Sequence, residues 1–248
     1  MAIIAVKSKL TLAHTTILTK RSFKMTRTKL KDRILPNYTH GEEIFNTASH
    51  IVGGVFGIAA LVLCVVFSAL KGDVFAVVSS AIYGASLTIL YTMSSVYHGL
   101  RANTAKKVMQ VLDHCTIYFL IGGTYTPVLL SGIRNHSPAW AWVLFGIVWG
   151  FAVFGATFTA IDIKKYSKLS MICYIGMGWS IVMAARVAFE AIPIGALLWI
   201  FLGGIAYTVG AVLYGIGKKH RYVHGVFHVF VLFGSVLQFF GIFFYLIM

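Results

Sequence analysis

Two histidines at the start of the last apolar segment have the spacing that metal chemistry requires. His224 and His228 stand four residues apart in "HGVFHVF", directly after the basic cluster that ends at Arg221. On an α-helix, residues i and i+4 lie one above the other on one face, so both imidazoles could bind one metal ion. The pair alone is a weak signal. Histidines at the edge of an apolar segment also extend toward water or hydrogen-bond a carbonyl.

Two other segments place polar residues at the same depth. In "SSVYHGL", Ser94 and His98 are four residues apart, and Arg101 follows three residues later. At about 1.5 Å per helical residue, His98 and His224 each lie roughly 4–5 Å inside the nearest basic residue. Asp113, six residues past the next basic pair, is at a similar depth. Ionisable groups are costly in apolar segments, and they are therefore candidates for function.

Three imidazoles at one level suit zinc, which in catalytic sites keeps three protein ligands and one open position. We predict that His98, His224 and His228 are the ligands. Asp113 and Ser94 would lie beside the coordinated water or orient an imidazole. Zinc lowers the pKa of a coordinated water far below that of bulk water, to about 7, which makes a nucleophile available at neutral pH.

Several neighbouring residues have a structural explanation as well as a functional one. Asp113 could simply be an N-terminal helix residue that the helix dipole favours. In "EEIFNTASH", Glu43, Asn46 and His50 follow i, i+3, i+7 spacing and share a face, so they are candidate supporting residues. Glu43 also fits the start of a helix. His114 lies about 100° around the helix from its neighbour and is predicted to point elsewhere.

The elements that position these residues are predicted to be membrane-spanning helices. Of 248 residues, 58% are hydrophobic and 11% charged, and the mean hydropathy is +0.84. Soluble domains carry roughly a quarter charged residues. No alternating segments of about ten residues, as in a β-barrel, occur. We predict an all-α, seven-transmembrane helix bundle, because seven apolar segments reach the roughly 20 residues that a span needs: 46–70, 73–99, 111–131, 138–160, 169–190, 194–216 and 222–247.

Basic residues predict the orientation. All but three of the 21 lysines and arginines fall in the N-terminal segment or in alternate connections on the same side; the exceptions are Lys71, Arg134 and Arg186. By the positive-inside rule, the N-terminus is cytoplasmic and the C-terminus extracytoplasmic. The net charge of +14 is therefore mainly a topology signal. We expect no nucleic-acid partner, because the charge is divided among short connections.

The chain divides into residues 1–40, predicted to be a basic, disordered cytoplasmic tail, and residues 41–248, the seven-span membrane domain. No apolar segment follows the first basic residues, so a cleaved secretory signal is not expected. The tail is predicted to lie near anionic headgroups, which makes membrane lipids its partners. Translation could instead start at Met25. The expected location is the plasma (inner) membrane, and we make no prediction of oligomeric state.

Other polar or reactive residues have structural explanations. Cys64, Cys115 and Cys173 fall in three different apolar segments without a paired spacing and are predicted to be small buried hydrophobic residues. Arg186 and Glu190 are spaced i to i+4 and are predicted to form an ion pair.

The same residues carry a family resemblance. The order "SSVYHGL", then "DH", then "HGVFHVF" resembles the S-x-x-x-H … D … H-x-x-x-H pattern of the progestin and adipoQ receptor (PAQR) family, in particular its bacterial hemolysin III branch. The resemblance covers residues 40–247. It implies a seven-span fold with a zinc ion near the cytoplasmic face, held by His98, His224 and His228, with Asp113 and Ser94 beside the zinc-bound water.

Three functional hypotheses follow. The first is a zinc-dependent membrane hydrolase of lipid amides or esters, because the family is related to membrane hydrolases that include alkaline ceramidases. In this hypothesis Asp113 transfers the proton, and Ser94 or the metal stabilises the oxyanion. The second is a non-enzymatic sensor or regulator of membrane state with structural zinc. The third is a cytolysin, although no apolar segment shows a polar stripe that could line an aqueous pore.

Overall fold

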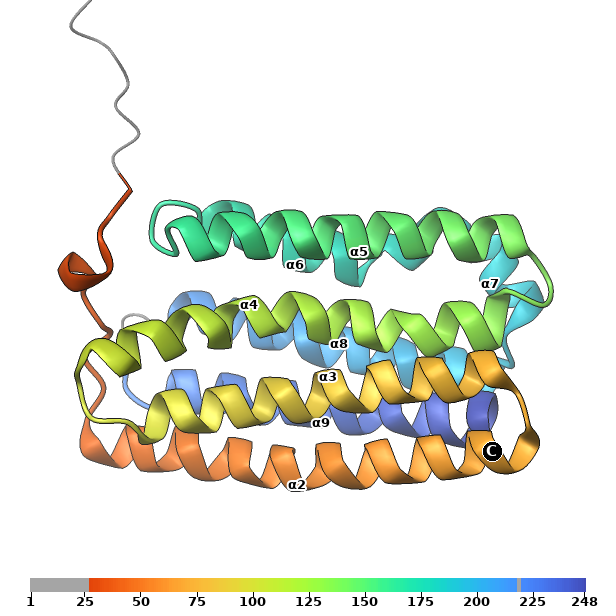
Figure 1. Cartoon of the computed structure of the whole chain (residues 1–248), viewed down its shortest axis with the longest axis horizontal. Helices are drawn as coiled ribbons and strands as arrows, with labels where there is room; N and C mark the ends of the chain where they lie inside the picture. The colour runs from red at the N-terminus through yellow and green to blue at the C-terminus, as the bar shows by residue number, and fades with distance from the viewer. Residues whose placement is uncertain (1–26, 218–219) are drawn as a thin grey trace, which may run out of the picture.

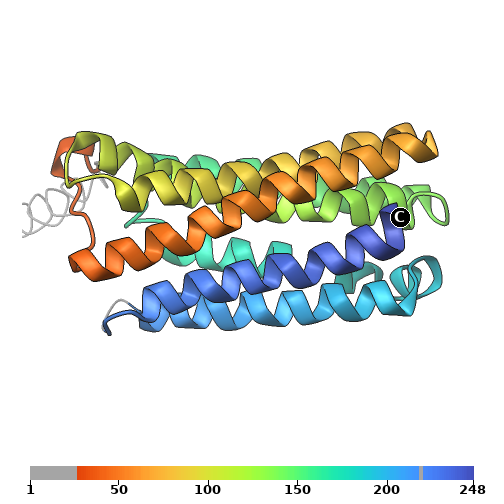
Figure 2. The same cartoon turned by 90° about the horizontal axis from the view of Figure 1, so that it is seen from below.

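The computed structural model describes residues 27–217 and 220–248. Within them, seven helices are long and apolar enough to cross a membrane, and they run side by side along one axis (Figures 1 and 2). The predicted all-α seven-span architecture is confirmed. The spans are α2 (His40–Lys71), α3 (Val74–Gly99), α4 (Thr104–Pro127) with the π-helical turn Val128–Ile133, α5 (Pro138–Ile161), α6 (Ser167–Gly178) with a 3-10 segment Ser180–Ala184 and α7 (Ala185–Ala191), α8 (Ile194–Ile216), and α9 (Val223–Ile242) with the π-helical turn Phe243–Ile247.

One end of the bundle, at the left of Figure 1, carries residues 27–39 and the connections that follow α3, α5 and α8. We call it the basic end, because it holds most of the described lysines and arginines. The C-terminus lies at the opposite end, as an odd number of spans requires. The predicted disordered tail falls largely on residues 1–26, which lie outside the described residues, as does the alternative start at Met25. Residues 27–39 lie against the basic end.

Two helices begin more than one turn earlier than predicted, both next to the candidate site. α2 begins at His40 rather than 46: the Thr39 hydroxyl accepts from the backbone N–H of Glu42, and the Glu42 carboxylate accepts from the N–H of Thr39. α4 begins at Thr104 rather than 111, because the Asn103 side chain caps the N–H of Lys106 at 2.9 Å. Such first turns are stabilised by capping rather than by apolar residues, so hydropathy alone does not find them.

The fifth span, predicted as one segment over 169–190, is interrupted. α6 ends at Gly178, and the chain continues through a 3-10 segment into α7. A broken helix in an apolar environment must satisfy its freed backbone groups. Tyr125 of α4 does so: its hydroxyl donates to the Gly178 carbonyl at 2.8 Å and accepts from the N–H of Ile181 at 3.0 Å.

The helices that carry the candidate site are packed tightly. α2 contacts both α3 and α9, and α9 also packs along α8. Gly53 of α2 faces the ring of Tyr91, which leaves no room for a β-carbon. The Tyr91 hydroxyl bonds Ser235 of α9 at 2.6 Å, and Ser235 also bonds Tyr207 of α8 at 2.7 Å. This cluster fixes three helices relative to one another.

Two structural predictions can be compared with the structure. Cys64, Cys115 and Cys173 are free; Cys64 and Cys173 are buried as predicted, and Cys115 is partly buried. The Nε atom of Arg186 lies 2.9 Å from Glu190 near the end opposite the basic end. Both side chains are exposed, so the pair contributes little to stability.

Candidate metal centre and its cavity

The three predicted histidine ligands meet at the basic end. His98 is the next-to-last residue of α3, and His224 and His228 lie in the first two turns of α9. All three are buried, and one nitrogen from each lies within 4.8 Å of the other two. The Nε2 atoms of His224 and His228 are 3.1 Å apart. Two nitrogens on one tetrahedral zinc, at about 2.0–2.1 Å from it, lie about 3.3 Å apart, so this pair is already close to metal-binding separation.

The hydrogen bonds of His98 fix which of its nitrogens is free. Nδ1 lies 2.6 Å from a Glu43 carboxylate oxygen. A carboxylate can only accept, so Nδ1 carries the proton and Nε2 carries the lone pair. Nε2 is buried and has no hydrogen-bond partner. A carboxylate that orients a histidine in this way is the usual support of a metal ligand. The donor set therefore fits a borderline-soft cation such as zinc.

Lys106 completes this support, and the sequence analysis missed it. Its ammonium group is buried and donates to the second Glu43 oxygen at 2.6 Å. It also donates to the carbonyls of His98 and Leu100, at 3.3 and 2.9 Å. Lys106 thus ties the end of α3 to the start of α2 and balances the carboxylate charge. The predicted spans 73–99 and 111–131 leave Lys106 in the connection between them, whereas the structure places it in the first turn of α4.

We expect the Glu43→Gln variant to bind zinc roughly 10- to 100-fold more weakly, the usual effect of losing a supporting carboxylate. Glutamine keeps an acceptor near His98 but removes the charge that Lys106 and the imidazole face. Competition with a chromogenic chelator measures the affinity. Glu42→Gln is the matched control, because the Glu42 carboxylate caps α2 and accepts from the N–H of Tyr222 instead. Equal losses in both variants would contradict a supporting role for Glu43.

The other two supporting candidates also lie at the site. The ring of His50 stacks on His228, with centroids 3.8 Å apart and planes at 17°, and Tyr91 meets its edge. Neither ring nitrogen of His50 has a hydrogen-bond partner. The Asn46 amide nitrogen is 3.4 Å from Nδ1 of His98. α2 and α9 approach so closely here that a β-carbon on Gly225 would collide with Phe45 and Asn46.

Tyr38, a residue without any signal in the sequence, covers the histidines from the basic end. Its ring stacks on His224, with centroids 5.0 Å apart and planes at 22°, and lies 5.7 Å from the ring of His98. Burial, together with nearby acidic groups, raises the pKa of Tyr38 far above its usual value, so the phenol stays neutral. It belongs to a segment that was predicted to be disordered.

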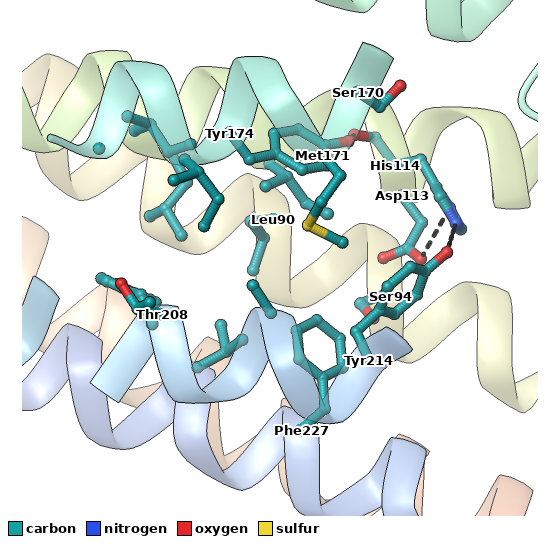
Figure 3. A pocket seen from close by; sticks show the side chains of 18 of the residues that line it. Leu90, Ser94, Asp113, His114, Ser170, Met171, Tyr174, Thr208, Tyr214 and Phe227 are labelled. Atoms are coloured by element: carbon teal, nitrogen blue, oxygen red, sulfur yellow. Dashed lines mark hydrogen bonds and ion pairs between the residues drawn. The ribbon is translucent and has the colours of Figure 1, made fainter. Parts of the chain in front are cut away.

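A cavity of about 170 Å³ adjoins the centre, with His224 and His228 on its wall. Figure 3 shows Ser94, Asp113 and Tyr214 gathered at one end of it. The Ser94 hydroxyl is buried and has no hydrogen-bond partner. The cavity extends away from this polar end between α3, α4, α6, α8 and α9. Its mainly apolar lining includes Leu90, Ile117, Leu120, Ile121, Met171 and Phe227. This shape suits an amphipathic ligand.

The prediction that His114 points away from the site is wrong. It lines the same cavity as Asp113, and its Nδ1 is 3.6 Å from that carboxylate (Figure 3). Nδ1 donates to the Gln110 carbonyl at 2.8 Å, and Nε2 lies 3.3 Å from the Tyr214 hydroxyl. Successive residues of α4 point about 100° apart around the helix. The cavity is wide enough for both Asp113 and His114 to reach it.

Comparison with known proteins places this arrangement in a family. The model of the family described as "Haemolysin-III related" matches residues 38–239. The chain belongs to the haemolysin-III related family. The match begins at Tyr38 and includes every residue of the centre described above. It agrees with the resemblance to the PAQR family and its hemolysin III branch.

Relatives span most of the chain. It is 35% identical to Hemolysin-3 of Bacillus cereus over 206 residues, covering 83% of this chain and 92% of that protein. It is 36% identical to the Hemolysin-3 homolog of Bacillus subtilis (strain 168), covering 84% and 96%. The human monocyte to macrophage differentiation factor is 25% identical over 216 residues, covering 84% and 85%. No solved structure matches the chain.

Proposed function

We propose that this haemolysin-III family protein is a zinc-dependent membrane hydrolase of lipid amides or esters, ceramidase-like in its reaction. One observation carries the proposal. Three buried imidazoles converge on one point, two of them on the wall of a largely apolar cavity that Asp113 and Ser94 also line. Ligands, an acid–base group and an apolar chain-binding space are thus adjacent.

Zinc held by His98, His224 and His228 would supply Lewis-acid activation of water at neutral pH. The protein's own groups do the rest. The Asp113 carboxylate takes a proton from the attacking water and returns it to the departing amine or alcohol. The Ser94 hydroxyl, which has no other partner, donates to the oxyanion that develops on the carbonyl oxygen. The products are a carboxylate and an amine or alcohol.

Zinc analysis and a turnover assay test the proposal together. The full chain, purified in lipid nanodiscs, is expected to carry about one zinc per chain and to cleave a panel of N-acyl and O-acyl lipids. A chelator should abolish turnover, and added zinc should restore it. Protein that carries zinc but cleaves none of these lipids would count against the hydrolase.

The second hypothesis, a sensor with structural zinc, also has an observation in its favour. The three ligands join the end of α3 to the start of α9, with Tyr38 packed over them, so a metal here would fasten the bundle. The zinc content of an Asp113→Asn variant separates the two hypotheses. The cytolysin hypothesis is supported only by names, those of the family and of the two Bacillus relatives.

We further propose that the basic end faces the cytoplasm and that the protein lies in the plasma (inner) membrane. The distribution of lysine and arginine supports this orientation. After Met248, only a reporter that works outside the cytoplasm is then expected to be active. At Asn103, only a reporter that works in the cytoplasm is expected to be active. Paired phosphatase and fluorescent-protein fusions measure this. Finding both positions on one side would overturn the orientation.

A further inference from the structure

A second cavity, of about 320 Å³, lies at the basic end between residues 28–38 and the ends of the helices beneath them. Polar groups line much of it, among them Thr28, Arg33, Gln110 and Lys164. It shares His114, Tyr214 and His224 with the cavity of the metal centre, so the two cavities adjoin. Nothing in the proposed hydrolysis uses this space.

Arg33, which lines this cavity, has some guanidinium donors with partners and others without. Its Nη2 donates to the carbonyls of Ala160 and Ile161, at 3.3 and 2.9 Å, at the end of α5. These bonds hold the guanidinium in place. Nε and Nη1, which carry three of the five guanidinium N–H groups, are buried and have no hydrogen-bond partner. Buried donors of a charged group without an acceptor are costly, so a fixed guanidinium in this state is set up to receive an acceptor from outside the chain.

The nearest carboxylate does not supply that acceptor. Asp162 accepts from the N–H of Thr28 at 3.0 Å and from the N–H of Lys165 at 3.1 Å. Burial opposes its ionisation, but these bonds and the nearby charge of Arg33 lower the pKa of Asp162 to about 2. Asp32 also lines the cavity, as does Lys164, so the fixed charges nearly balance. Among the residues that the structure describes, no carboxylate forms an ion pair with Arg33.

We propose that this cavity binds the anionic end of a single-chain amphiphile, a carboxylate or a phosphate, with Arg33 as its main donor. Charge-assisted hydrogen bonds from an arginine suit both oxyanions. The apolar chain would pass His224 into the adjoining cavity, whose lining residues on α9 extend to Gln238. From His224 to Gln238 the helix rises about 21 Å, enough for the chain of one leaflet, about half of the roughly 30 Å core.

The test measures binding and needs no turnover. The full chain is placed in nanodiscs of zwitterionic phosphatidylcholine, and Kd values are measured for dodecanoate, dodecyl phosphate, uncharged dodecanol and inorganic phosphate. We expect Arg33→Gln to raise the Kd of an anionic amphiphile roughly 10- to 100-fold. Arg101→Gln is the matched control: it removes the same charge from an exposed position at the same end, outside both cavities, and should leave the Kd unchanged.

The four ligands distinguish the sources of the anion. Tighter binding of dodecanoate assigns the site to a carboxylate, such as the product of the proposed hydrolysis. Tighter binding of dodecyl phosphate assigns it to a lipid-derived phosphate. The proposal would be overturned if inorganic phosphate bound as tightly as dodecyl phosphate, or if dodecanol bound as tightly as dodecanoate. So would equal Kd values for wild type and Arg33→Gln, or equal losses in Arg33→Gln and Arg101→Gln.

Three further measurements separate this result from folding and from the metal. Arg33→Gln also loses its bonds to α5, so the melting temperature without ligand is recorded, and Arg33→Lys, which keeps the charge, should show an intermediate Kd. Every Kd is measured on zinc-loaded and on chelator-treated protein, because a carboxylate can also bind a metal. The Arg33 effect should be the same in both. A protein that fails the turnover assay can still pass this test, and the reverse also holds.

Discussion

The His228→Ala protein is expected to lose its zinc and to unfold at a markedly lower temperature. His228 is buried, and its ring stacks on His50. Its Nε2 lies 3.1 Å from Nε2 of His224, the other predicted ligand on α9. Alanine therefore removes a ligand and leaves a cavity in a packed region. The cavity alone should cost at least about 2 kcal/mol. Loss of the metal adds to this, because the free energy of metal binding is also free energy of folding.

Elemental analysis and thermal unfolding, each with and without a chelator, separate these two contributions. The chelator should lower the melting temperature of the wild type strongly and that of His228→Ala very little. The difference in melting temperature between wild type and His228→Ala that persists in chelator measures the lost packing. His136→Ala is the control: His136 is exposed near the opposite end and contacts Glu190. It should keep its zinc. Full zinc occupancy in both His228→Ala and His98→Ala would show that the metal lies elsewhere or is absent.

The spans could be predicted from the sequence because a lipid environment imposes a simple rule. Each span needs about 20 apolar residues, and every predicted segment matches a span of the structure. The starts of α2 and α4 could not be predicted from apolar length. They depend on the capping side chains of Thr39 and Asn103, which stabilise polar first turns. The break after Gly178 depends on a hydroxyl from a different helix, Tyr125, and so has no local signal.

The histidine cluster could be predicted because depth can be read along each helix. Counting residues from the nearest basic residue placed His98 and His224 at the same depth in the membrane. Because the spans run side by side, residues at the same depth can meet. A rotation of about 100° between neighbouring residues does not separate them when one cavity is wide enough to meet both, which is why His114 was misplaced. Depth along a helix says nothing about segments that are not predicted to be helical. Tyr38 belongs to such a segment, and Lys106 was counted only for its charge, although its long side chain reaches Glu43.

The Asp113→Asn protein is expected to keep its zinc and its melting temperature and to lose turnover. Asp113 lines the cavity of the metal centre, beside His114, and is not among the three converging ligands. Asparagine preserves the size of the side chain but cannot accept the proton. Turnover of an active lipid amide or ester should fall roughly 10²- to 10⁴-fold, the usual contribution of general acid–base catalysis. Ser94→Ala is the companion variant, because it removes a hydrogen-bond donor and leaves the base intact.

The zinc content of Asp113→Asn decides between enzyme and structural metal protein. With zinc retained and turnover lost, the metal has an open position and Asp113 acts on the reacting water. If Asp113→Asn instead loses zinc as completely as His228→Ala, the carboxylate is a fourth ligand and no position remains for water. Zinc would then fasten α3 and α9 to α4, where Asp113 lies. Closed four-ligand sites are structural. That outcome would replace the hydrolase with the sensor, whose response to the membrane would be carried by the packing of these three helices.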